Sequence, residues 1–151
     1  MKVFRIIAWI ALIVIVVIQF FPVDYNQSET LSQTDFMLVN KVPAAVEKSL
    51  KVSCYDCHSN YTNYPWYNKV QPLAWFLENH IAEGKAELNF NDWAEYSNRR
   101  KKSKLRSIVN QIENDEMPMD SYTLIHKDAV LSQKDKTLIV EYMKMLKDNL
   151  E

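Results

Sequence analysis

The chain has 151 residues, a formal net charge of −1, and a hydrophobic fraction of 48%. This length suits one globular domain with a hydrophobic core, and the balanced charge gives no general attraction to nucleic acid, so we expect no nucleic-acid partner. Gly84 is the single glycine, which excludes phosphate-binding loops of the GxGxxG or GxxxxGK[ST] type because these need several glycines. Hairpins with Asn-Gly or Asp-Gly turns are disfavoured for the same reason, so we expect an all-α fold.

The N-terminal region is a nearly uninterrupted apolar segment. Lys2 and Arg5 precede an uncharged run from Ile6 to Val23, and its length approaches the roughly 20 residues that cross a bilayer as a helix. A cleaved signal peptide is the alternative, but no small residues of the A-x-A type follow the run. We therefore predict an uncleaved membrane anchor over residues 1–23, and the basic residues before it place the rest of the chain outside the cytoplasm.

Helical patterns dominate the rest of the chain. Residues 24–42 are polar and irregular apart from an apolar patch at 36–39, and we interpret them as a tether to a domain of residues 43–151. Helices are predicted from Pro43 to Cys54, from Leu73 to Gly84 with the glycine as C-cap, from Asn91 to about Ile112, and from a capping box at Ser132 and Asp135 to about Leu146.

Both cysteines lie in the segment CYDCH, Cys54 to His58. A zinc site would need further ligands, but His80 and His126 are far apart and fit no H-x₃₋₅-H pattern. A thioredoxin-type redox motif would follow a strand, whereas a helical pattern precedes Cys54. A disulfide between the two thiols is the remaining alternative in an oxidising compartment.

C-x-x-C-H is also the attachment signature of c-type haem. Residues i and i+3 lie on the same side of a helical turn, so both thiols can form thioethers with the two vinyl groups of one porphyrin. The imidazole of the next residue can then reach the iron axially. We therefore predict haem c, with its iron, covalently attached at Cys54 and Cys57 and ligated by His58.

From Val42 onwards, the chain resembles a single-haem cytochrome c and, more narrowly, the haem-binding-domain proteins of bacterial envelopes. The resemblance rests on CYDCHSNYTNYPWYNKVQPLAWFLENHIAEGKAELNFNDW and on MPMDSYTLIHKDAVLS. It implies a small cytochrome c-like helical domain whose first and last helices cross, with Met117 as the second axial ligand. It also implies that a proline carbonyl, from Pro72 or Pro65, accepts the N–H of the imidazole of the first ligand.

The occupant of the sixth iron position separates the candidate functions. Met119, His80 and His126 are alternatives to Met117 there. A filled position predicts an electron carrier that exchanges electrons with redox partner proteins of the envelope, and we assign no catalytic residue. An open position predicts a haem-based peroxidase or a small-ligand sensor, and a third alternative is a disulfide-bonded interaction domain without cofactor. Combined with the anchor, the carrier is expected to be a membrane-tethered, single-pass protein of the bacterial inner membrane whose haem domain faces the periplasm.

Overall fold

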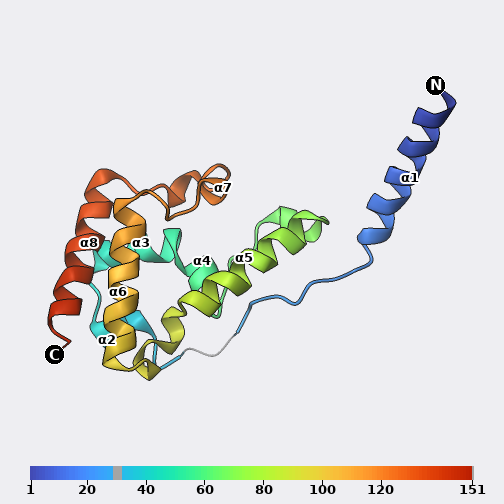
Figure 1. The fold of residues 1–151 in the computed structure, drawn as a ribbon. Helices are drawn as coiled ribbons and strands as arrows, with labels where there is room; N and C mark the ends of the chain where they lie inside the picture. The colour runs from blue at the N-terminus through green and yellow to red at the C-terminus, as the bar shows by residue number, and fades with distance from the viewer. Residues whose placement is uncertain (29–31, 151) are drawn as a thin grey trace.

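Helices are the regular secondary structure of the described chain. The computed structural model describes residues 1–28 and 32–150, and within them it contains no strand, only an isolated bridge between Gln27 and Tyr61. The predicted all-α class is therefore confirmed. The α-helices in Figure 1 are α1 (Lys2–Ile18), α2 (Phe36–Asn40), α3 (Ala44–Ser53), α4 (Tyr55–His58), α5 (Leu73–Glu87), α6 (Asn98–Glu113), α7 (Asp120–Thr123) and α8 (Gln133–Asp148). Short 3₁₀ helices are η1 (Trp66–Lys69), η2 (Phe90–Glu95) and η3 (Lys127–Ala129).

The hydrophobic core lies where α6 and α8 pack along each other, with α3 against α8 (Figure 1). Leu105 of α6 and Ile139 and Met143 of α8 have no exposed surface. An aromatic cluster extends this core, because Phe36 packs edge-on against Trp93 with the ring centroids 4.9 Å apart. The spacing i, i+4 of Ile139 and Met143 places both side chains on the same buried face of α8.

The observed helix boundaries confirm one prediction and correct two. The capping box of α8 is present, since Ser132 and Asp135 each bond the backbone N–H of the other. Gly84 is not a C-cap, because α5 continues past it. The third predicted helix does not begin near Asn91, because the residues there form η2, and α6 begins only after its N-cap residue Ser97.

The N-terminal helix α1 is apolar but short. It spans 17 residues, which corresponds to roughly 26 Å at 1.5 Å per residue, less than the hydrocarbon thickness of about 30 Å in a typical bilayer. Within the described residues, no helix has both the length and the apolar character needed to cross a membrane. The predicted transmembrane helix is therefore wrong, and so is the single-pass inner-membrane location with a periplasmic haem domain that depended on it.

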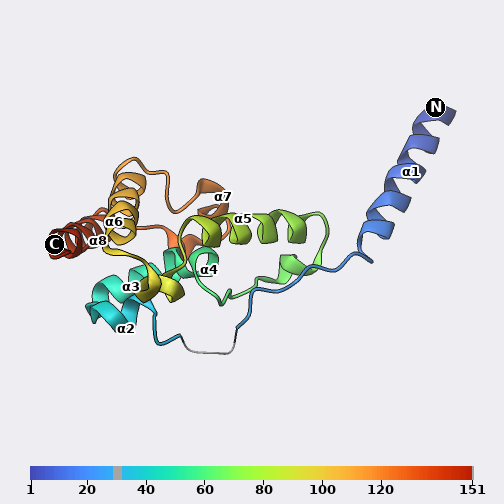
Figure 2. The same ribbon diagram turned by 60° about the horizontal axis from the view of Figure 1, so that its bottom comes forward.

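The segment after α1 is hydrogen-bonded to the loop between α4 and α5 (Figure 2). The side chain of Gln19 donates to the carbonyl oxygen of Gln71 at 3.1 Å and accepts from its backbone N–H at 2.9 Å. The side-chain amide of Asn26 donates to the carbonyl oxygen of Ser59 and to Oγ1 of Thr62, both at 2.9 Å. We call residues 19–28 the N-terminal strap. Helix α1 therefore ends at the residue before Gln19, where the strap first contacts this loop.

The later part of the predicted tether also contacts the folded unit. Phe36 is fully buried, and Asp35 caps α2 by accepting from the backbone N–H of Met37 at 2.8 Å. Residues 29–31 of that tether, and residue 151 of the predicted domain, lie outside the described residues. The boundaries 1–23, 24–42 and 43–151 stay predictions.

Candidate functional site

The CYDCH segment forms one helical turn directly after α3. That helix ends at Ser53, and α4 begins at Tyr55. The backbone N–H groups of Cys57 and His58 both donate to the carbonyl oxygen of Cys54, at 3.2 and 3.0 Å. Both cysteines are free thiols. The motif is thus compact, and α4 lies in contact with α3 on one side and with α5 on the other.

The imidazole of His58 is held by carbonyl groups of α5. Its Nδ1 lies 2.8 Å from the carbonyl oxygen of Gly84 and 3.0 Å from that of Leu88. Because a carbonyl can only accept, Nδ1 carries the proton and Nε2 keeps its lone pair. Burial lowers the pKa of His58, so the ring is neutral at neutral pH and this lone pair remains available to a metal.

This geometry corrects the expected partner of the imidazole. The resemblance implied a carbonyl of Pro72 or Pro65, but the acceptors are Gly84 and Leu88. Sequence distance suggested the prolines, whereas the folded chain brings the last turn of α5 beside α4. The carbonyl group of Leu88, the C-cap residue of α5, lies beyond the last residue of the helix, where carbonyl groups lack intrahelical partners and can accept an imidazole N–H. The carbonyl oxygen of Gly84 accepts the backbone N–H of Leu88 and the imidazole N–H together.

A cavity of about 310 Å³ lies beside the imidazole. Three of the predicted site residues, Cys54, His58 and Met117, line it together. Cys57 does not line it, and lies instead where α4 meets α5. The apolar part of the lining includes Leu50, Leu88, Phe90, Ile108 and Ile112. The cavity is therefore largely apolar and is bordered by two possible metal ligands, His58 from α4 and Met117 from the loop after α6.

The two thiols are protonated in this environment. Burial raises the pKa of Cys54 to about 12 and that of Cys57 to about 11, with smaller contributions from the neighbouring negative charges of Cys57 and Asp56, respectively. Redox-active and nucleophilic cysteines have a lowered pKa instead. The environment of CYDCH therefore disfavours the thioredoxin-type interpretation.

The alternative axial ligands lie elsewhere. Nδ1 of His80 is 2.8 Å from the carbonyl oxygen of Phe76 in its own helix, and Nε2 of His126 is 2.9 Å from the hydroxyl of Tyr67. Met119 is the N-cap residue of α7. None of these three candidates lines the cavity that His58 borders.

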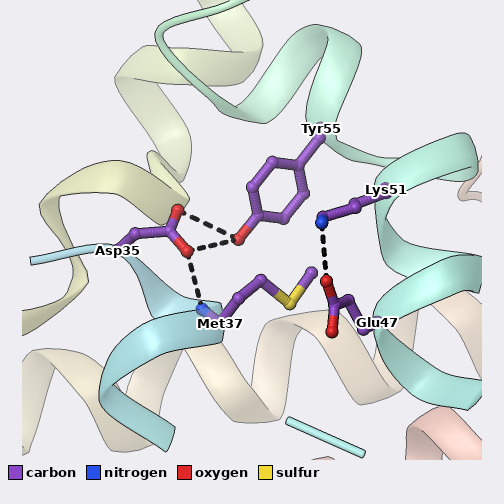
Figure 3. Close-up of polar contacts among 5 residues, drawn as sticks. All are labelled: Asp35, Met37, Glu47, Lys51 and Tyr55. Atoms are coloured by element: carbon purple, nitrogen blue, oxygen red, sulfur yellow. Dashed lines mark hydrogen bonds and ion pairs between the residues drawn. The ribbon is translucent and has the colours of Figure 1, made fainter. Parts of the chain in front are cut away.

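The two inner residues of the motif anchor it to the rest of the fold, which sequence reasoning missed. The hydroxyl of Tyr55 donates to both carboxylate oxygens of Asp35, at 3.1 and 3.3 Å (Figure 3). On the other side, Asp56 accepts from the hydroxyl of Tyr122 at 2.7 Å and from the backbone N–H of Asn63 at 3.1 Å. A local sequence pattern cannot predict these two bonds, because in each of them the tyrosine is far from the aspartate in the sequence.

The groups around the cavity fit a haem. The cavity brings together an imidazole with a free Nε2, the thioether of Met117 and the thiol of Cys54, which are donors that c-type haem uses. The second thiol, that of Cys57, lies on the adjoining turn where α4 meets α5. The apolar lining suits a porphyrin, and the volume lies at the lower end of the range for ligand pockets. At the border of the cavity, Lys104 and Glu87 pair with each other at 3.5 Å, so the charges there are balanced.

Comparison with known proteins identifies the family. The family model described as "Haem-binding domain" matches residues 13–145, which covers most of the chain and includes both the CYDCH segment and Met117. No curated protein and no solved structure matches the chain. The match agrees with the donors gathered at the cavity, and the chain belongs to the haem-binding domain family.

Proposed function

We propose that this haem-binding protein carries its haem covalently at Cys54 and Cys57, with His58 and Met117 as axial ligands, and that it transfers electrons. The observation that carries the proposal is the imidazole of His58, whose proton is held at Nδ1 by two carbonyl groups while its ring borders the cavity. A hydrogen bond of this kind orients a metal-ligating imidazole and makes it a stronger donor.

Met117 is the best-supported second ligand. It lines the same cavity as His58, whereas Met119, His80 and His126 do not. A thioether is a common partner of histidine in cytochromes c and favours a higher reduction potential. The apolar side chains that line the cavity would act in the same direction.

Electron transfer follows from this donor set. Haem would supply a one-electron iron couple when bound, and a haem held by both His58 and Met117 would leave peroxide or oxygen no protein-free coordination position. Among the described residues, Glu87 is the one carboxylate that borders the cavity, and it is paired with Lys104. The site therefore lacks a side chain suited to proton transfer during peroxide cleavage. The partner we propose is a redox protein that accepts or supplies single electrons.

Covalent attachment is tested by expressing the full chain together with a cytochrome c maturation system. The wild-type protein should keep its haem in a denaturing gel and stain for it. Cys54→Ala and Cys57→Ala should each leave one thioether, and the double variant should release its haem on denaturation. A wild-type protein that loses all its haem on the gel would show that attachment is not covalent.

The ligand and the activity are tested on the same haem-loaded protein. Met117→Ala should remove the thioether-to-iron charge-transfer band of the ferric form and admit carbon monoxide in the ferrous form, and Met119→Ala, the matched control, should do neither. The wild-type protein should reduce an acceptor cytochrome rapidly and react slowly with hydrogen peroxide. Rapid peroxide turnover, or tight carbon monoxide binding by the wild type, would favour the peroxidase or sensor interpretation instead.

A further inference from the structure

We propose that Gly84 is a positioning residue for His58: by lacking a side chain, it lets α5 approach α4 closely enough for the carbonyl groups of α5 to hold the imidazole. The inference rests on the proposed function, because it concerns the residue that we assign as the proximal ligand. It gives a purpose to the single glycine of the chain.

The contact at Gly84 leaves no room for a Cβ atom. A Cβ added there would lie 2.7 Å from the carbonyl oxygen of Cys57 and 3.3 Å from its Cβ. The closest atom belongs to the backbone, so no side-chain rotation can relieve the clash. Gly84 has no positive φ and lies inside α5, where glycine is unfavourable compared with alanine. Close approach to α4, rather than backbone freedom, therefore explains the glycine.

The same close approach supplies both acceptors for the imidazole. Gly84 and Leu88 are one helical turn apart, and their carbonyl oxygens lie 2.8 and 3.0 Å from Nδ1 of His58. The carbonyl oxygen of Gly84 also accepts the backbone N–H of Leu88 at 2.9 Å. Because the two acceptors belong to one helix end, a displacement of α5 at residue 84 moves both away from the ring.

The helix end also polarises the imidazole. Leu88 is the C-cap residue of α5, so its carbonyl lies at the negative end of the helix dipole. Donation from Nδ1 to these carbonyls raises the electron density at Nε2 and strengthens it as a ligand. Loss of the contact should therefore weaken the donor, which disfavours the ferric state and raises the reduction potential.

The experiment compares Gly84→Ala with Ala82→Ser, which adds a single heavy atom at an exposed position of the same helix. In the haem-free full-length chain, nitrogen-15 NMR of the imidazole should show only the Nδ1–H tautomer in the wild type and in Ala82→Ser. An Nε2–H population should appear in Gly84→Ala. In the haem-loaded proteins, the midpoint potential should rise in Gly84→Ala and stay unchanged in the control.

Unchanged tautomer and potential in Gly84→Ala, or equal shifts in the control, would overturn the proposal. If Gly84→Ala does not fold, the NMR spectrum of the wild type tests the proposal by itself. An imidazole protonated at Nε2, or an Nδ1–H that exchanges freely with water, would show that the carbonyl groups of α5 do not hold the imidazole of His58. The outcome is separable from the proposed function, since a wild-type chain that attaches no haem refutes covalent attachment while the NMR comparison still tests Gly84.

Discussion

At the scale of single residues, Tyr55 shows how the motif is tied to the core. Its hydroxyl donates to the buried carboxylate of Asp35 (Figure 3), which also accepts from the side-chain amide of Asn91 at 2.8 Å. Its ring stacks on Phe90 with the ring planes 5° apart. Burial and the neighbouring charge of Asp35 raise the pKa of Tyr55, so the hydroxyl keeps its proton and donates at neutral pH.

Tyr55→Phe should therefore destabilise the protein while leaving the stacked ring in place. A buried carboxylate that loses a donor costs about 1–3 kcal/mol in the free energy of unfolding. Urea denaturation of the haem-loaded protein measures this cost. Tyr61→Phe is the matched control, because that side chain is 49% exposed and its hydroxyl should contribute little. Equal stabilities of the two variants would show that the bond to Asp35 is not stabilising.

At the scale of elements, the sequence predicts correctly the features that depend on residues close together in the chain. The capping box at Ser132 and the CYDCH turn depend on residues three positions apart, and both form as expected. The role of Gly84 depends instead on α4, so a local reading took it for a C-cap. The partner of His58 was missed for the same reason, and the buried position of Phe36 depends on distant aromatic residues. Tertiary contacts determine the role of Gly84, the partner of His58 and the burial of Phe36. The periodic pattern of apolar residues carries no information about such contacts.

The N-terminal strap is the element that local reading described least well. The sequence predicts residues 19–23 as the end of a membrane anchor and residues 24–28 as the start of a polar tether, yet Asn26 makes several hydrogen bonds. Besides donating to Ser59 and Thr62, the side chain of Asn26 accepts from Nζ of Lys85 at 2.6 Å. These bonds hold the strap beside the loop that follows the CYDCH turn (Figure 2).

Asn26→Ala should release the strap without unfolding the domain. Each lost hydrogen bond contributes about 1 kcal/mol, so local opening, and with it proteolytic cleavage within residues 19–28, should become at least roughly ten-fold more frequent. Limited proteolysis followed by mass spectrometry locates the cuts. Asn79→Ala is the control, since Asn79 is exposed and its side chain donates to Glu83 of the same helix at 2.8 Å. A strap that is cleaved equally in both variants would mean that Asn26 does not hold it.

At the scale of the whole molecule, the core and the cavity adjoin each other and share Leu50, Leu88, Phe90 and Ile112. Leu105, Ile139 and Met143 are fully buried between α6 and α8 and do not border the cavity. The segment after Met117 is joined to the motif by a hydrogen bond from the Tyr122 hydroxyl to Asp56 at 2.7 Å, and to the end of α3 by a hydrogen bond from Ser53 to the carbonyl oxygen of Ala129 at 2.9 Å. We therefore expect the α6–α8 pair to stay folded when haem is removed from the cavity.

Removal of the haem should consequently loosen one side of the molecule only. We compare the haem-loaded wild type with the haem-free wild type, expressed without the maturation system. Amide hydrogen exchange should accelerate in α4 and in residues 117–131, because this loop would lose the bond from Met117 to the metal. Exchange in α8 should change little, since burial of Ile139 and Met143 does not involve the cavity. Loss of protection throughout α8 would instead show that the core itself depends on the cofactor, as in proteins whose fold forms only when their metal is bound.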